Sequence, residues 1–254
     1  MAMRIMRALL LPMILLLCWQ TASSLGLVSP YLLPPPLEVL RSAADMLESG
    51  LLARHMEASL GRVARGFSLS VVLGCVLAFL LSFLPRLEKA LDPVLSFLRM
   101  TPPLATIPLL ILWLGIGEAT QLAIIFLASF FPVFLNARAG FARLDAPFRE
   151  LAASLALSRL DYARYFVWPA AFPSIITGIR LSFGYSWRAL IAAELIAAGS
   201  GLGYMISDAE QMQRVDIVMV GIFVIGITGW ALDALFRRIV IRLAGRRFPE
   251  LEEA

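Results

Sequence analysis

The 254-residue sequence has little charge for its length. Charged residues make up 16% of the chain, against about 25% in an ordinary soluble domain. Hydrophobic residues make up 60%, and the mean hydropathy is +0.83. A soluble fold has no interior large enough for this much apolar surface, so the composition favours a membrane protein.

Cysteine, histidine and lysine are nearly absent. Cys18 and Cys75 both lie inside apolar runs, which argues against a disulfide framework or a metal site. His55 is the only histidine and lies outside every apolar run, so an intramembrane hydrolase has no base or ligand set. Lys89 is the only lysine, and no Gly-x-x-x-x-Gly-Lys-Ser/Thr phosphate loop surrounds it. We therefore expect no enzyme activity, no metal and no cofactor in this chain.

Long apolar runs are abundant. A helix needs about 20 apolar residues to cross the hydrocarbon core of a bilayer. Six candidate spans follow, at roughly Ala8–Val28, Gly66–Leu84, Leu104–Ile116, Thr120–Ala139, Ser174–Ala198 and Ile217–Phe236. The third is short and contains Pro108, so its ends are the least defined. The runs lack the alternation of a membrane barrel. The sequence therefore predicts an all-α membrane protein of about six transmembrane helices.

The first run also resembles a signal peptide, because Arg4 and Arg7 precede it. Leu17 is large where a small residue is expected before a lipoprotein cysteine, and the apolar character continues past Cys18. Its length favours an uncleaved first span.

Basic residues orient the predicted bundle. With the N-terminus inside, most of them fall on inner segments, and the outer segments hold only Arg41, Arg54, Arg62, Arg65 and Arg214. The positive-inside rule places both termini in the cytoplasm. Arg62 and Arg65, at the outer start of the second span, are the contrary feature, and snorkelling to the interface would accommodate them.

The outer segment 29–60 differs from the spans. Pro34, Pro35 and Pro36 favour an extended start. Apolar residues then recur at helical spacing, at Leu37, Leu40, Ala44, Leu47 and Leu51. The pattern predicts an amphipathic helix lying at the outer interface. His55, near its end, is expected to be a surface or packing residue.

The stretch "RELAASLALSRLDYARYFVWP", residues 149–169, is charged and lies between the fourth and fifth spans on the cytoplasmic side. It predicts two short helices with a tight turn at Ala156–Leu157. Ser158 is expected to cap the second helix by accepting a hydrogen bond from the backbone near Asp161. Asp161 and Arg164 are spaced to form an ion pair, and Pro169 is expected to end the helix. Such helices suit either a solvated connector or a docking element for a cytoplasmic partner.

This stretch resembles the "EAA" loop of type I ABC importer permeases. Glu150, Ala152 and the pair Trp168–Pro169 fit that signature, while Ala156 stands where the family has glycine. A residue with a Cβ disfavours the left-handed backbone of such a turn. We therefore expect a tighter or less left-handed turn. The resemblance implies that the loop sits in a groove of an ATPase, with contacts from Glu150, Leu151, Ala152, Ser154, Leu155, Ala156, Ser158 and Arg159.

Further motifs extend the resemblance over roughly Leu33 to Phe236. "TPPLATIPLLILWLGIGEATQ", "FPVFLNARAGFARLD", "FPSIITGIRLSFGYSWRALIAAELIAAGSGLGYMISDAEQ" and "VDIVMVGIFVIG" resemble the branch that imports nitrate, taurine, alkanesulfonates and related small anions. The resemblance implies a multi-pass protein of the bacterial plasma (inner) membrane with the type I permease fold. It implies a second, identical permease copy, two cytoplasmic ATPases that bind ATP and Mg, and an outer-face solute-binding protein; no nucleic acid is expected.

These features together predict a domain organisation. Residues 1–59 form the first transmembrane helix and the outer amphipathic segment. Residues 60–244 form the core permease domain, with the EAA-type loop at 146–168. Residues 245–254 form a cytoplasmic tail.

Ionisable residues in the fifth span are candidates for the translocation pathway, because charge at membrane depth is costly and usually faces a cavity or a partner. Arg180 and Arg188 either line the pathway, where they would favour an anion, or have a structural role. Snorkelling at the inner interface is favoured for Arg180, and the pathway is favoured for Arg188, which lies deeper. Tyr185 and Trp187 flank Arg188 and are either pathway candidates or core packing residues. Glu194 has two readings, a pathway residue or a packing residue paired with a neighbouring helix.

Small residues in and after the fifth span are expected to serve packing. Gly178 and Gly184 suit close helix contact. The glycines of "GSGLGY", residues 199–204, are expected to form a tight turn.

We therefore expect the permease subunit of an ATP-driven importer for a small anionic solute. The alternative is an ion-coupled secondary transporter or a channel, which would call for inverted repeats or broken helices with paired acids. The chain shows no obvious internal repeat, and Glu194 is the only deep acid identified. Nitrate, taurine, alkanesulfonates, aromatic acids and thiamine precursors all stay open as substrates.

Overall fold

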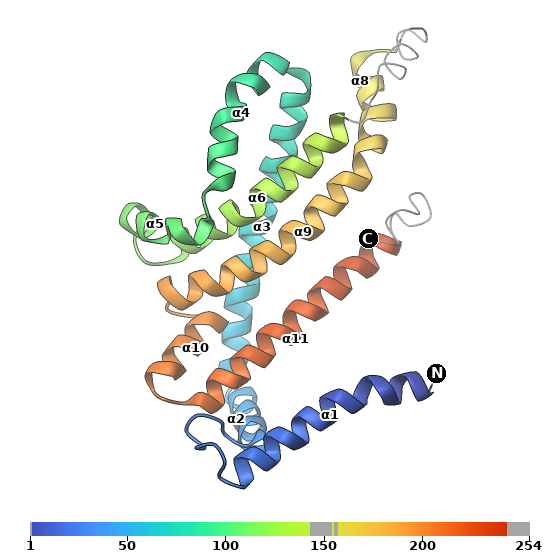
Figure 1. The fold of residues 1–254 in the computed structure, drawn as a ribbon. Helices are drawn as coiled ribbons and strands as arrows, with labels where there is room; N and C mark the ends of the chain where they lie inside the picture. The colour runs from blue at the N-terminus through green and yellow to red at the C-terminus, as the bar shows by residue number, and fades with distance from the viewer. Residues whose placement is uncertain (1, 143–153, 155–156, 243–254) are drawn as a thin grey trace. The chain divides into compact units, whose positions relative to one another are not determined.

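The computed structural model describes residues 2–142, 154 and 157–242, which are helices and loops with no strand among them (Figure 1). Two compact units are present, and each is described by itself. The first comprises the described residues up to Ser59 together with Gly199–Ile227. The second comprises the described residues of Leu60–Ala198 and those from Thr228 onward. Two long helices, α3 (Leu51–Phe83) and α11 (Val215–Val240), contribute to both units.

The first unit contains α1 (Ala2–Ser24), α2 (Pro36–Glu48) and α10 (Leu202–Gln211). The end of α1 is tied to the proline-rich segment that follows it. The indole N–H of Trp19 donates to the carbonyl of Pro34 at 3.0 Å, and the hydroxyl of Ser23 donates to the carbonyl of Leu33 at 3.1 Å. These bonds satisfy backbone carbonyls that lie outside any helix.

The predicted helix of the outer segment is confirmed as α2. It begins directly after Pro35, because a proline is well suited to the first turn, where no N–H is needed. Val39, Ser42 and Met46 are its buried residues, whereas the predicted leucine stripe, including Leu40 at 66%, is exposed.

The turn before α10 explains the role of His55. Gly201 has a φ of 113°, which a residue with a Cβ rarely adopts. Its N–H donates to Nδ1 of His55 at 3.1 Å, and the N–H of Leu202 donates to the hydroxyl of Ser59 at 2.9 Å. Both acceptors come from the first turns of α3, so they cap the start of α10. The expected tight turn is confirmed, and His55 serves in packing.

The second unit contains most of α3, with α4 (Pro85–Met100), α5 (Ile107–Leu114), α6 (Glu118–Ala142), α8 (Arg159–Tyr162), α9 (Trp168–Ala197) and the end of α11. The helices α6 and α9 pack side by side along most of their length (Figure 1). The core around them contains Leu81, Phe134, Phe141, Val167 and Ile175.

Glycine and serine bring these helices together. A Cβ on Gly178 would lie 2.6 Å from the Cβ of Asn136, so α9 and α6 can approach only because that position has no side chain. The hydroxyl of Ser182 donates to the carbonyl of Ser129, and the hydroxyl of Ser129 lies 2.7 Å from that of Ser70. Gly178 therefore has its predicted role, but a Cβ on Gly184 would meet nothing within 4 Å, so the packing prediction for that residue is wrong.

Four of the described helical segments are long and apolar enough to cross a membrane: α3, α6, residues 163–197 and α11. They correspond to the second, fourth, fifth and sixth predicted spans. The third predicted span consists of α5, whose eight residues reach only about 12 Å. It joins α4 through a bend of 87°, and the pair makes a fifth, broken span if counted as one. The apolar part of the first segment, Leu10–Ser24, is shorter than the others.

Pro169 does not end the helix that precedes it, contrary to expectation. A π-helical turn over Ala163–Val167 joins α8 to α9, and the N–H of Trp168 donates to the carbonyl of Ala163. This turn interrupts the α-helical bonding directly before Pro169, which then occupies the first turn of α9. The chain therefore stays helical through the proline.

Candidate functional site

A cavity of about 410 Å³ lies between α9 and the second half of α11. Its charged lining residues are Arg180, Arg188, Asp233 and Arg237. Gly184, which has open space where a Cβ would be, also lines it. The glycine therefore makes room in a cavity rather than bringing two helices together.

A second cavity of about 550 Å³ lies between α9, α6 and the bend that joins α4 to α5. Arg99, Thr101 and Thr106 bring polar groups to an otherwise mostly apolar wall. Tyr185 and Arg188 line this cavity as well as the first one. Arg188 is thus accessible from both cavities.

The Arg188 side chain is exposed and forms no ion pair with any residue that the structure describes. It lies nine residues before the end of α9, or about 14 Å along the helix axis, a distance comparable to half the thickness of a bilayer of about 30 Å. A guanidinium at that depth is stable only against water, a partner or a ligand. The two cavities supply that environment.

Arg180 and Asp233 form an ion pair across the first cavity. The distances from Nε to Oδ1 and from Nη2 to Oδ2 are both 3.4 Å, and both side chains are partly exposed. Arg180 therefore pairs with α11, which the snorkelling interpretation did not include.

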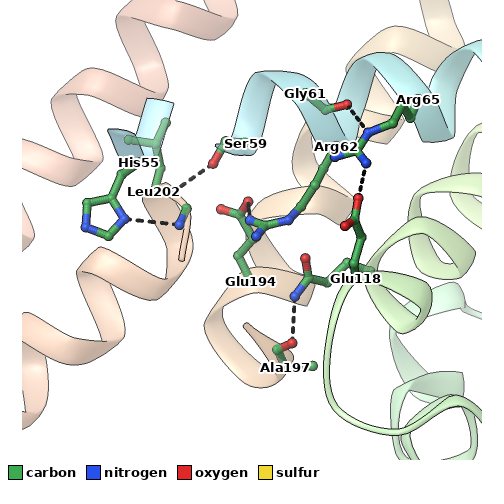
Figure 2. Close-up of polar contacts among 11 residues, drawn as sticks. His55, Ser59, Gly61, Arg62, Arg65, Glu118, Glu194, Ala197 and Leu202 are labelled. Carbon is green, nitrogen blue, oxygen red and sulfur yellow. Dashed lines mark hydrogen bonds and ion pairs between the residues drawn. The ribbon is translucent and has the colours of Figure 1, made fainter. Parts of the chain in front are cut away.

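Arg62 of α3 and Glu194 of α9 form a buried ion pair with an Nη1–Oε1 distance of 2.7 Å (Figure 2). The exposed fractions of the two side chains are 11% and 0%. Arg62 does not snorkel, because its head group turns inward to an acid. Arg65, one turn further along α3, pairs with Glu118 at the start of α6, and both of these side chains are about half exposed.

The four pathway candidates thus occupy different surroundings. Tyr185 and Arg188 share both cavities. Trp187 is buried, and a Cβ on Gly229 of α11 would lie 2.7 Å from its Nε1, so Trp187 contacts that helix closely. Glu194 is paired with Arg62. Of the four candidates, Tyr185 and Arg188 therefore lie together at these two cavities.

Sequence reasoning missed Asp233 and Arg237. Asp233 is the only acid between Ile217 and Phe236, and it is spaced one turn from Arg237. Glu194 is therefore not the only acid within a predicted span. A search for single acids in every apolar run would have found Asp233.

The described part of the charged loop begins with the predicted helix cap. The N–H of Asp161 donates to the hydroxyl of Ser158 at 3.1 Å, and that hydroxyl donates to Oδ2 of Asp161 at 2.6 Å. The predicted cap is confirmed, and α8 begins at Arg159. Arg164 lies over the ring of Tyr165, 5.8 Å from its centroid, rather than pairing with Asp161.

The other residues of the predicted docking loop are less completely described. Ser154 is helical and exposed. Glu150, Leu151, Ala152, Leu155 and Ala156 lie outside the described residues, so the predicted turn geometry at Ala156 is not tested.

The profile of the family described as "Binding-protein-dependent transport system inner membrane component" matches residues 70–248. The chain belongs to this family. Among its relatives, a protein of Bacillus subtilis (strain 168), named as a candidate aliphatic sulfonates transport permease protein, SsuC, is 38% identical over 94% of this chain and 86% of its own length. The taurine transport system permease protein TauC of Escherichia coli (strain K12) is 36% identical over 91% and 86%. The bicarbonate transport system permease protein CmpB of Synechocystis is 34% identical over 86% and 81%.

The protein is therefore a permease subunit of an ABC importer, of the branch that includes sulfonate and taurine permeases. It is a multi-pass protein of the bacterial plasma membrane and is not itself an enzyme. Family membership also implies an ATPase and a binding protein as partners. The secondary-transporter alternative has no support from these relatives.

Proposed function

We propose that this permease admits a small anion bearing a sulfonate, carboxylate or similar oxyanion group, and that Arg188 binds that group in transit. The exposed guanidinium of Arg188, shared by two cavities at membrane depth, is the observation that carries the proposal. The names of the relatives agree, because aliphatic sulfonates, taurine and bicarbonate all present an oxyanion.

Arginine suits this role better than lysine would. Its guanidinium is planar, stays charged at every physiological pH, and binds an oxyanion through two parallel hydrogen bonds. Tyr185 beside it adds a hydroxyl to the same walls. The remaining walls are mostly apolar, which strengthens the attraction for an anion relative to bulk water.

We further propose that two identical copies enclose the pathway and that ATP and Mg are bound by separate ATPase subunits. Large apolar side chains of α5 and its C-terminal loop support the first part, because Leu112, Trp113 and Ile116 are between 68% and 79% exposed. In a dimer, a second copy of the permease would bury these side chains against its own apolar surface.

The charged loop is proposed to bind the ATPase. The Ser158 cap supports this interpretation, since it defines the start of a helix directly after the segment that contains Glu150. The sequence pattern from Glu150 to Pro169 carries the rest of the proposal.

Transport into proteoliposomes tests the anion proposal. The permease, its ATPase and its binding protein are reconstituted, and ATP-dependent uptake of taurine, ethanesulfonate and bicarbonate is measured. We expect Arg188→Gln to reduce uptake of the transported anion at least tenfold and Arg188→Lys to retain part of it. The control is Arg41→Gln, which removes the same charge from an exposed position on α2. Normal uptake and normal solute range in Arg188→Gln would refute the proposal.

Co-purification tests the docking proposal. Glu150→Arg should abolish retention of the ATPase by the tagged permease and ATP-dependent uptake with it. Glu48→Arg makes the same change at an exposed position of α2, and it should alter neither the retention of the ATPase nor the uptake. Intact association in Glu150→Arg would exclude a docking contact at that residue.

A further inference from the structure

The first cavity holds more charge than the proposed function uses. Arg180 and Arg237 line it together with Arg188, and Asp233 is the acid among its described lining residues. These four groups have a formal charge of +2. A concave site with apolar walls and a net positive charge raises the local concentration of anions.

The Arg180–Asp233 pair is loosely made. The Nε–Oδ1 and Nη2–Oδ2 distances are both 3.4 Å, longer than the 2.7–2.9 Å typical of charge-assisted hydrogen bonds. The exposed fraction of the Asp233 side chain is 48%. The Arg62–Glu194 pair of the same unit shows the contrast, since it is buried and 2.7 Å long. The carboxylate of Asp233 is therefore both accessible and held by long contacts to Arg180.

We propose that this cavity is a second anion site beside Arg188, in which the carboxylate of Asp233 competes with the transported anion for Arg180. The proposal rests on the proposed function and specifies how the same anion leaves Arg188. An anion that enters the cavity displaces Asp233 from Arg180, and the return of Asp233 displaces the anion. Arg237 adds attraction from α11 without a described acid as its partner.

Competition between Asp233 and the transported anion would allow three arginines to bind the anion and still release it. A transport pathway must bind its solute strongly enough to admit it and weakly enough to release it. Three guanidinium groups without an acid would hold an oxyanion too tightly. A built-in carboxylate lowers the affinity because the anion must compete with it, and the four groups keep a net formal charge of +2.

The position along α9 points to the release side. Arg180 lies eight residues before Arg188, or about 12 Å closer to the start of the helix. The start of α9 follows the charged loop, and the distribution of basic residues predicts that this end is cytoplasmic. An anion passing from Arg188 to Arg180 would thus move toward the cytoplasm.

The test combines binding and transport in the complete transporter. Equilibrium binding of radiolabelled taurine, ethanesulfonate and sulfate is measured on the purified permease–ATPase complex without its binding protein, and uptake is measured in proteoliposomes. Asp233→Asn should bind the anion about tenfold more tightly, a modest part of the Coulomb energy available to such a pair. Its uptake should have a lower maximal rate and a lower KM. Asp233→Glu should behave as wild type, and Arg180→Gln/Asp233→Asn should lose the gain in affinity.

A pair of neighbouring arginines provides a second test that leaves the ion pair intact. Arg237→Gln should weaken anion binding at least threefold. Arg238→Gln, which removes the same charge from an exposed residue outside the cavity lining, should not. If Asp233→Asn fails to assemble, the comparison of Arg237→Gln with Arg238→Gln still tests whether the cavity binds an anion.

The outcomes separate this site from the proposed function. Three results would each overturn the second site. The first is unchanged or weaker anion binding in Asp233→Asn, and the second is an equal effect of Arg237→Gln and Arg238→Gln on binding. The third is no binding of any of the three anions to the wild-type and Asp233→Asn complexes. The proposed function would still stand if Arg188→Gln lost uptake. Intact uptake in Arg188→Gln would refute the proposed function itself.

Discussion

Replacement of Glu194 by glutamine tests how the buried ion pair holds α3 to α9. The Nη1 of Arg62 lies 2.7 Å from Oε1 of Glu194, and the exposed fraction of the Glu194 side chain is 0%. Removing one partner of a buried pair leaves an uncompensated charge, at a cost of about 3–5 kcal/mol. Glutamine can still accept a hydrogen bond from Arg62, so we expect a loss near the lower limit, about 3 kcal/mol.

The Arg65–Glu118 pair is a matched control. It joins α3 to the start of α6 one turn further along, but its side chains are 57% and 50% exposed. Exposed pairs contribute only about 0–1 kcal/mol, so Glu118→Gln should change stability little. The double variant Arg62→Gln/Glu194→Gln should cost less than the sum of its single variants, because no lone charge is left buried.

Unfolding of the detergent-purified permease, followed by tryptophan fluorescence, measures these differences. Equal stability of Glu194→Gln and Glu118→Gln would refute the reasoning, and so would additive effects in the double variant. Uptake assays then decide between the two readings of Glu194. A packing residue loses stability and keeps its solute range, whereas a pathway residue changes its solute range at unaltered stability.

Three further predictions concern local contacts. Ser158→Ala removes the cap of α8, at a cost of about 1 kcal/mol, and should speed backbone hydrogen exchange across that helix; unchanged exchange would contradict it. Gly178→Ala places a Cβ where 2.6 Å separates it from a neighbouring side chain, and should cost about 1–3 kcal/mol in unfolding assays. Gly184→Ala, with nothing within 4 Å, should fold as wild type, and equal losses in both variants would count against the argument. Ser42→Ala removes a buried hydroxyl that donates to Asp216 at 2.5 Å and should cost about 1.5–3 kcal/mol, with a wild-type melting temperature as the contrary result.

The helical class and most of the spans could be predicted because both depend on composition alone. A long apolar run in lipid has to satisfy its backbone within itself, and only a helix does so in one segment. The path of the chain around Leu104 was harder to predict, because the hydropathy of a segment does not show where the helix axis bends. Its apolar run continues, but Pro102 and Pro103 separate α4 from α5 and the chain turns through 87° there.

The cap at Ser158 and the continuation through Pro169 show where local rules succeed and fail. The cap depends on residues three apart, so its chemistry is complete within the motif. The proline rule assumes an α-helix on both sides of the proline. The π-helical turn at Ala163–Val167 changes the bonding pattern before Pro169, and a residue count along the sequence does not reveal such a turn.

Long-range partners explain the remaining differences. The energetic rule that a charge at membrane depth needs a partner or a cavity applies equally to Arg62, Arg180 and Arg188. Arg62 meets an acid 132 residues away, and Arg180 meets one 53 residues away, at separations that no local pattern encodes. Arg188 meets no acid among the described residues. An arginine that lines a cavity without an acid as its described partner still has hydrogen-bond donors for a ligand. The proposed anion site is therefore better identified by the absence of such a partner among the described residues than by the presence of arginine.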